Sequence, residues 1–202
     1  ASFYNALYGG VKTEAGECVP PFRDRIRHRS FDRLDARGGR ADIEARLVWE
    51  MDGGRPVLDE RRRLVVHSLG AGEYLLDLTW ILTASLGDVL FASDDVHYAW
   101  PFLRLATDFS GEKGGKITSD TGAAGQEATN MKPALWIDYS NSLEGIPDGV
   151  AVFQWPDGRE HRWLTREYGT FGPRRPDDRS GKPFTLKKGE SITQRVGVLV
   201  HS

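Results

Sequence analysis

Cysteine and metal-binding patterns are almost absent from this chain. Cys18 is the only cysteine among 202 residues, so an intramolecular disulfide and a paired-cysteine zinc motif are both excluded. The five histidines are scattered and form no HxH or HExxH arrangement, the spacings that local zinc sites use. The sequence therefore predicts no metal site, and the single thiol leaves the redox compartment undecided.

Long apolar runs and a strong net charge are also missing. No stretch approaches the roughly 18 apolar residues of a membrane span. The 27 basic and 29 acidic residues give a net charge of -2, which disfavours nucleic acid and anionic membranes as partners. Residues 1–10 lack the basic start and apolar run of a signal peptide. We expect a soluble protein, either cytoplasmic or exported after signal removal, and the compartment stays unknown.

The motifs of several large enzyme classes do not occur. The chain has no GxSxG, no P-loop and no GxGxxG between a strand and a helix. Acyl transfer, phosphoryl transfer and dinucleotide binding therefore lack their usual motifs, and no cofactor is predicted. The charged clusters at 59–63 and 187–190 are interpreted as a strand surface and a hairpin turn. The alternating arginines between Arg23 and Arg29 have the pattern of the outer face of a strand.

Apolar and polar residues alternate over most of the chain, which is the period-two pattern of half-buried antiparallel strands. The clearest cases are 42–49, 74–83 and 192–201. Glycine-rich turns at 52–54 and 69–72 should join three successive strands into a meander. Further strands are expected at 97–106, 134–140, 148–155 and 162–171.

No long amphipathic helix is predicted, and about a dozen strands with polar connections imply two stacked sheets that share a core. The predicted fold is an all-β antiparallel β-sandwich. Residues 1–202 are predicted to form a single domain, because all-β chains of this length commonly do.

The segment 114–139 is long, polar and rich in glycine, and it ends in an aromatic strand. Long loops inside compact domains are uncommon and are usually functional or disordered. We therefore expect this segment to be a loop that crosses the rim of the sandwich and forms the functional surface.

Three residues are the candidates for acid and base chemistry on a sugar: His97, Glu127 and Asp138. Glu127 lies in the glycine-rich segment, and Asp138 shares strand parity with Trp136, so the last two should point to one face. An aromatic plane beside a carboxylate suits a pyranose ring. The alternatives are that Asp138 orders a turn, that Trp136 is a core residue and that His97 is a plain rim histidine.

A second group would position the substrate. Arg166 presents a planar fork and Tyr168 a hydroxyl, which could clamp a uronate or a keto-sugar. The alternative is that Arg166 bridges a neighbouring carboxylate. The predicted substrate-binding residues are Arg104, Trp136, Tyr139, Arg166 and Tyr168.

Six segments carry a family resemblance. In chain order they are RIRHRSF, VWEMDGGRPVLDERRRL, GGKITSDTGAAGQEAT, WIDYS, REYGTF and TLKKGESITQRVGVLVH. Together, over about residues 24–202, they resemble the PmoA-like family, a bacterial domain family of unknown function. The resemblance implies a β-sandwich related in outline to the galactose-mutarotase supersandwich, often found beside sugar oxidoreductases and glycan-degrading genes. Methane oxidation is not implied, because the chain has no membrane span and no evident copper cluster.

The chain departs from the family pattern at its start. The pattern includes a His-His-Arg segment upstream, which residues 1–23 lack, so this N-terminal segment is atypical. A sheet edge would then need cover from a partner or a second copy, and a homo-oligomer is an open expectation.

We predict a protein that binds or acts on carbohydrate. One hypothesis is an enzyme that epimerises, eliminates or hydrolyses a sugar or oxidised sugar by acid and base chemistry. The alternatives are a sugar-binding module without catalysis and a structural or assembly β-sandwich.

Overall fold

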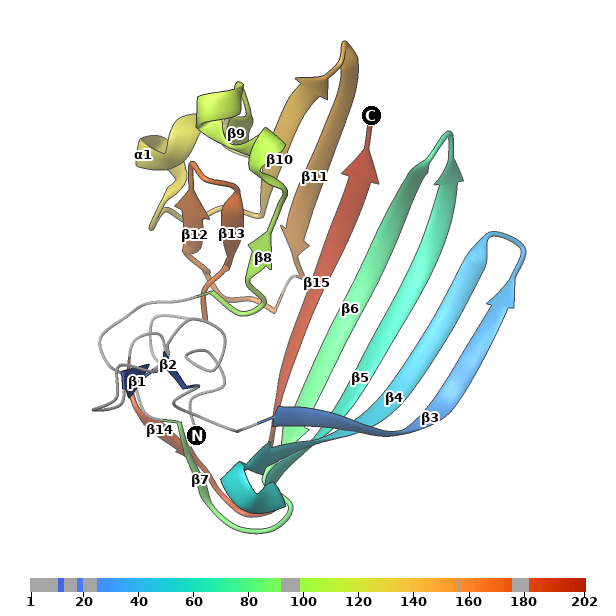
Figure 1. Cartoon of the computed structure of the whole chain (residues 1–202), viewed down its shortest axis with the longest axis vertical. Helices are drawn as coiled ribbons and strands as arrows, with labels where there is room; N and C mark the ends of the chain where they lie inside the picture. The colour runs from blue at the N-terminus through green and yellow to red at the C-terminus, as the bar shows by residue number, and fades with distance from the viewer. Residues whose placement is uncertain (1–10, 13–17, 20–24, 92–98, 156, 176–181) are drawn as a thin grey trace.

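The chain folds as an antiparallel β-sandwich, which confirms the predicted fold class (Figure 1). The structure is a computed structural model that describes residues 11–12, 18–19, 25–91, 99–155, 157–175 and 182–202. Within these ranges the longest helix is α1, Gly125–Thr129. No described helix has the length and apolar character that a membrane crossing requires.

One large sheet forms the first layer. Its eight strands run in the order β3, β4, β5, β6, β15, β11, β10, β9. Their bounds are Arg25–Arg37, Arg40–Met51, Arg55–Gly70, Glu73–Thr83, Ser191–His201, Ile146–Gln154, Trp136–Leu143 and Lys116–Ser119. Every neighbouring pair is antiparallel, and β3 and β9 are the two edge strands.

The second layer is smaller. It contains a three-stranded sheet in the order β12, β13, β8, and Figure 1 shows this sheet beside the β9 to β11 end of the large one, far from β3 and β4. Its strands are Trp163–Arg166, Thr170–Pro173 and Leu103–Arg104. The remaining elements are β1 (Val11–Lys12), β2 (Cys18–Val19), η2 (Asp52–Gly54), β7 (Val89–Phe91), η3 (Thr107–Phe109), η4 (Gly111–Lys113) and β14 (Phe184–Leu186).

The predicted meander is confirmed as β4, β5 and β6. The two connections fall at the glycine-rich turns, and Gly70, Ala71 and Gly72 all have positive φ angles of 94°, 51° and 87°. Glycine adopts this conformation without a steric penalty, so the sequence of the turn permits the tight reversal. The period-two pattern then assigns alternate residues to the two faces of the sheet.

The shared core lies between the small sheet and the inner face of β10, β11 and β15. Ile137, Tyr139 and Val196 on the large sheet pack with Trp163 and Phe171 on the small one, and all five are fully buried. Truncating either of the two buried aromatic residues Trp163 and Phe171 to alanine would cost about 3–5 kcal/mol. A second cluster at the lower end joins Leu58, Leu82, Ala84, Leu186 and Ile192.

The outer face of the large sheet carries ion pairs that link neighbouring strands. Arg63 of β5 donates to both carboxylate oxygens of Asp42 on β4, and Arg195 of β15 donates to both oxygens of Asp77 on β6. These bidentate pairs are the strong geometry for arginine and carboxylate. They join β4 to β5 and β6 to β15 on the side that has no second layer (Figure 1).

The predicted arginine face of β3 is confirmed from residue 25 onward, and Arg23 lies outside the described residues. Arg25, Arg27 and Arg29 all reach the carboxylate of Glu50, whose side chain is fully buried. Burial alone would raise the pKa of Glu50, but hydrogen bonds from Arg25 and Arg27 outweigh it and hold that pKa below its ordinary value.

Two strand predictions are wrong in extent. The segment 97–106 yields the two-residue strand β8 and one isolated bridge at Ala99 within its described part, and Pro101, which lacks a backbone donor, interrupts it. The segment 162–171 is two strands, because Gly169 takes a φ of 85° and reverses the chain between β12 and β13.

The segment 114–139 is not a structureless loop as predicted. It contains β9, which pairs with β10, and the helix α1, which packs against β9 and β12. The pairing of β9 with β10 and the contact of α1 with β12 join residues that are far apart in sequence, so the local composition of the segment did not indicate them.

We predict that Asp42→Asn lowers the free energy of unfolding at neutral pH by about 1 kcal/mol, at the low end for charged hydrogen bonds because the arginine partners are half exposed. The hydrogen bond from Arg63 holds the pKa of Asp42 below its ordinary value of 3.8. A depressed folded-state pKa stabilises the protein fully above that value, and the benefit is lost as the pH falls through the folded-state pKa. The variant should therefore lose less stability on acidification than the wild type.

Urea unfolding over a series of acidic pH values measures both effects. Asp32→Asn is the matched control, because Asp32 forms a more exposed ion pair with Arg46. Equal stability losses in the two variants at neutral pH would contradict a larger contribution from the Asp42 ion pairs than from the exposed Asp32 pair.

Candidate functional site

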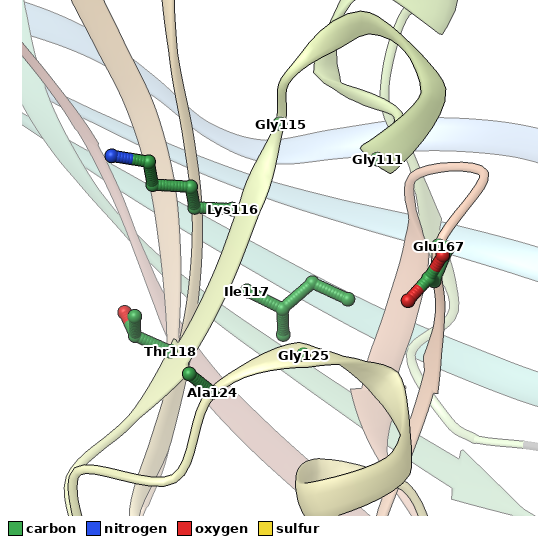
Figure 2. A pocket seen from close by; sticks show the side chains of 8 residues that line it. All are labelled: Gly111, Gly115, Lys116, Ile117, Thr118, Ala124, Gly125 and Glu167. Atoms are coloured by element: carbon green, nitrogen blue, oxygen red, sulfur yellow. The ribbon is translucent and has the colours of Figure 1, made fainter.

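The segment 114–139 borders a pocket at the free edge of β9, with a volume of about 260 Å³ (Figure 2). Its lining residues come from β9, the start of α1, the η4 turn and the β12–β13 hairpin: Gly111, Gly115, Lys116, Ile117, Thr118, Ala124, Gly125 and Glu167. The pocket therefore lies where the sequence predicts the functional surface.

The side chains around this pocket offer little chemistry. In Figure 2 the side chains of Ile117 and Glu167 lie on the same side of β9, whereas those of Lys116 and Thr118 extend to the other side. Gly115 is required there, because a Cβ would collide with the carbonyl of Phe109. The pocket thus presents backbone, an apolar side chain and the Glu167 carboxylate, and it lacks an aromatic platform.

Glu127 and Asp138 are not brought together, so the predicted acid and base pair does not form. Glu127 is exposed on α1, and the end of that helix is held against the small sheet by a 2.8 Å hydrogen bond between the hydroxyls of Thr129 and Thr165. Asp138 alternates with the buried Ile137 and Tyr139, so its side chain points to the outer face. The two carboxylates lie on opposite sides of the large sheet.

Trp136 and Asp138 share the outer face, as their parity predicts. Trp136 packs against Phe153 of β11 with ring centroids 6.4 Å apart, and Asp138 Oδ1 lies 2.8 Å from Nε2 of His201 on β15. The imidazole lies over Gly149, where a Cβ would overlap the ring. Asp138 therefore fastens the last strand to β10 across β11. His97 lies outside the described residues.

Tyr139 and Arg166 make contacts within the fold. The Tyr139 hydroxyl donates to the carbonyl of Arg166 and accepts from its N–H, each at 3.0 Å, and burial raises the pKa of this phenol. Arg166 donates to Asn130 Oδ1 at 2.8 Å. Tyr168 is 54% exposed at the hairpin tip, with the guanidinium of Arg104 5.4 Å from its ring centroid. These residues do not line one shared cavity with Asp138.

A different group of polar and aromatic residues gathers on the inner face of β4, β5 and β6. The side chain of Glu60 is fully buried; its Oε2 accepts from Nε1 of Trp49 and its Oε1 accepts from Nε of Arg62, both at 2.6 Å. Trp80 is the register partner of Arg62 on β6. We call Trp49, Glu60, Arg62 and Trp80 the Glu60 cluster.

The Glu60 cluster lies where the second layer ends. Strand register places Phe31, Ala45, Arg62, Trp80 and Gln194 in one row across five strands of the inner face. Phe31 is 54% exposed and the Arg62 side chain 37% exposed, whereas Glu60 is inaccessible. Along this row the inner face is therefore part of the core at Trp80 and exposed to solvent at Phe31.

Sequence reasoning missed this group by treating 59–63 as surface charge. That interpretation is correct for Arg61, which pairs with Glu44 at 3.4 Å with a side chain 57% exposed, and wrong for Glu60. The signal was present in the parity of the strand, because Glu60 and Arg62 share the even-numbered positions of the apolar residues Leu58 and Leu64. Charged residues on the apolar face of a strand indicate a paired or functional group.

Among the described residues, no group of three or more His, Cys, Asp or Glu side chains is placed to hold a metal ion. The Glu60 carboxylate has an aromatic N–H and a guanidinium as partners, which is an arrangement that orients an arginine.

Comparison with known protein families gives one decisive match. The family model described as a family of unknown function (DUF6807) covers residues 19–202. The chain belongs to this family. The DUF6807 assignment carries no activity, and the PmoA-like resemblance stays a prediction beside it.

Comparison with curated proteins gives no match. Among solved structures, a GH36 α-galactosidase AgaA variant from Geobacillus stearothermophilus in complex with raffinose is similar at 16% identity and a TM-score of 0.34. AgaB, a GH36 α-galactosidase from the same organism, gives the same values. Each match covers 94% of this DUF6807 chain and 29% of the α-galactosidase chain. The chain therefore spans less than a third of the length of these α-galactosidases. Likeness at this level carries no functional argument.

We predict that Gly149→Ala destabilises the protein by about 1–3 kcal/mol, because the added methyl group forces the His201 ring away from Asp138. In a His201→Ala background the same glycine change should cost far less, since the obstructing ring is gone. Thermal unfolding of the four proteins in this double-mutant cycle measures the coupling. Additive effects would show that His201 does not occupy the space above Gly149.

Proposed function

We propose that this chain is a carbohydrate-binding protein whose ligand lies on the inner face of β3 to β6, over the Glu60 cluster. The observation that carries the proposal is the buried Glu60 carboxylate, which holds the indole of Trp49 and the guanidinium of Arg62 at 2.6 Å each. A buried charge is costly unless it is paired, so this arrangement fixes both partners.

The residues that border the Glu60 cluster suit a sugar. Aromatic rings pack against the C–H faces of a pyranose, and Phe31 and Trp80 stand in the same row as Arg62. Arg62 and Gln194 supply hydrogen-bonding groups within that row. Ala45, between Phe31 and Arg62 in this row, has a short side chain that is itself buried.

Preorganisation supports binding here. An arginine loses rotamer entropy when it meets a ligand, and a partner that already fixes its plane reduces that cost. Glu60 provides this constraint from below the surface, because its side chain is inaccessible and each oxygen already accepts a hydrogen bond. Its role is therefore positioning.

Binding is favoured over catalysis on the same geometry. Acid and base chemistry needs two groups within hydrogen-bond reach of one substrate, and Glu127 and Asp138 lie on opposite sides of the sheet. The PmoA-like resemblance and the mutarotase-like outline belong to this proposal as expectations about the ligand class.

We predict that Arg62→Gln weakens binding of the best-bound sugar by about tenfold or more, since a charge-assisted hydrogen bond contributes about 1.5–3 kcal/mol. Isothermal titration calorimetry with short oligomers of glucose, galactose, mannose and galacturonic acid measures the affinities. Phe31→Ala should also weaken binding of the same sugar, because it removes an exposed ring from the row.

Arg61→Gln is the matched control. Arg61 is the adjacent residue on β5, has the same chemistry and points to the outer face, where it meets Glu44. Its loss should leave the affinity unchanged. Equal effects of the Arg61 and Arg62 substitutions, or an absence of binding to every oligomer, would refute the proposed function.

A further inference from the structure

We propose that the ligand of the Glu60 cluster is an acidic oligosaccharide, bound through a sugar carboxylate that contacts Arg62. This inference rests on the proposed function and adds the chemical class of the sugar. Three observations support it: the unused donors of Arg62, the charge composition of the inner face, and the length of the row in which Arg62 stands.

Arg62 keeps its terminal nitrogens available. Its bond to Glu60 uses Nε, and among the described residues no other hydrogen bond from this guanidinium is found. The side chain is 37% exposed, so Nη1 and Nη2 can reach solvent. Two parallel N–H donors in one plane match the two oxygens of a carboxylate, whereas a single hydroxyl uses only one of them.

The surroundings of Arg62 are apolar. Strand register assigns the inner positions of β4, β5 and β6, and among them Glu60 and Arg62 are the charged side chains. Because Glu60 is inaccessible, Arg62 is the charge that this part of the inner face presents to a ligand. A charged hydrogen bond gains strength beside apolar groups such as Leu64, Leu78 and Trp80.

A second cation lies at the border of this surface. The guanidinium of Arg175 stands 4.3 Å from the ring centroid of Phe184 and 5.8 Å from that of Trp100. Both rings pack against the same lower cluster as Trp49. The guanidinium of Arg175 therefore lies against two rings of the same cluster that Trp49 borders.

The dimensions favour an oligomer over a single sugar. Phe31 and Trp80 lie three strand spacings apart in one row, and adjacent strands are separated by about 4.8 Å, which gives a span of about 14 Å. One pyranose ring cannot touch both aromatic residues across this span. A short chain of uronate sugars can place one ring near Phe31 and a carboxylate beside Arg62.

The test compares two forms of one ligand. Oligogalacturonate and its fully methyl-esterified form have the same length and ring stereochemistry and differ in the carboxylate. Calorimetry with the whole chain should show that the acid form binds at least about tenfold more tightly than the ester. Arg62→Gln should remove that preference, and Arg62→Lys should retain part of it, because lysine keeps the charge but lacks the planar fork.

Each result decides something. Equal affinity for acid and ester would overturn the acidic-sugar inference and leave carbohydrate binding in place. If the acid, the ester and every neutral oligomer all fail to bind, both the acidic-sugar inference and the proposed function are overturned. A preference for the acid that survives unchanged in Arg62→Gln would overturn the role of Arg62. Arg61→Gln controls for the loss of one positive charge, and near-ultraviolet circular dichroism establishes that each variant is folded.

Discussion

The structure depends on one mismatch: the eight-stranded sheet has a wider apolar inner face than the second layer covers. The small sheet covers β9, β10, β11 and β15, where the large buried aromatic residues gather. Toward β3 the cover ends, and Phe31 and Leu34 are 54% and 68% exposed. An uncovered apolar sheet face of this kind is a place where a ligand or another chain can bind. The Glu60 cluster lies at this boundary, partly inside the core and partly accessible.

Strand parity then decides what each charged residue can do. On β5, Arg61 and Arg63 point outward into ion pairs with Glu44 and Asp42, whereas Glu60 and Arg62 point inward. On β10, the inward Tyr139 is core and the outward Asp138 fastens the last strand through His201. A shift of one residue would exchange these roles, because the two faces alternate with period two. The outer face therefore stabilises the sheet, and the inner face carries the candidate site.

Much of the fold was readable from the sequence, because the meander of β4 to β6 rests on local alternation and on turns that need glycine. The second layer was less readable. It depends on contacts between segments that are distant in sequence, which composition does not reveal. These are the pairing of β9 with β10 and the hydrogen bond that holds α1 to Thr165. For the same reason Trp136 and Asp138 were correctly assigned to one face, while the expected approach of Glu127 failed. Glu60 was missed because its cluster of charges was judged by composition instead of by strand parity.

The most direct test of the account is to observe where an acidic oligosaccharide touches the protein. Two-dimensional 1H–15N NMR resolves the indole N–H signals of the six tryptophans, and the Arg62 Nε signal can be followed in the same spectra. On titration with oligogalacturonate, the signals of Trp49, Trp80 and Arg62 should shift together, while Trp136 on the outer face should not. Shifts confined to Trp136, or to Gly115 and Gly125 at the β9 pocket, would contradict a ligand site on the inner face.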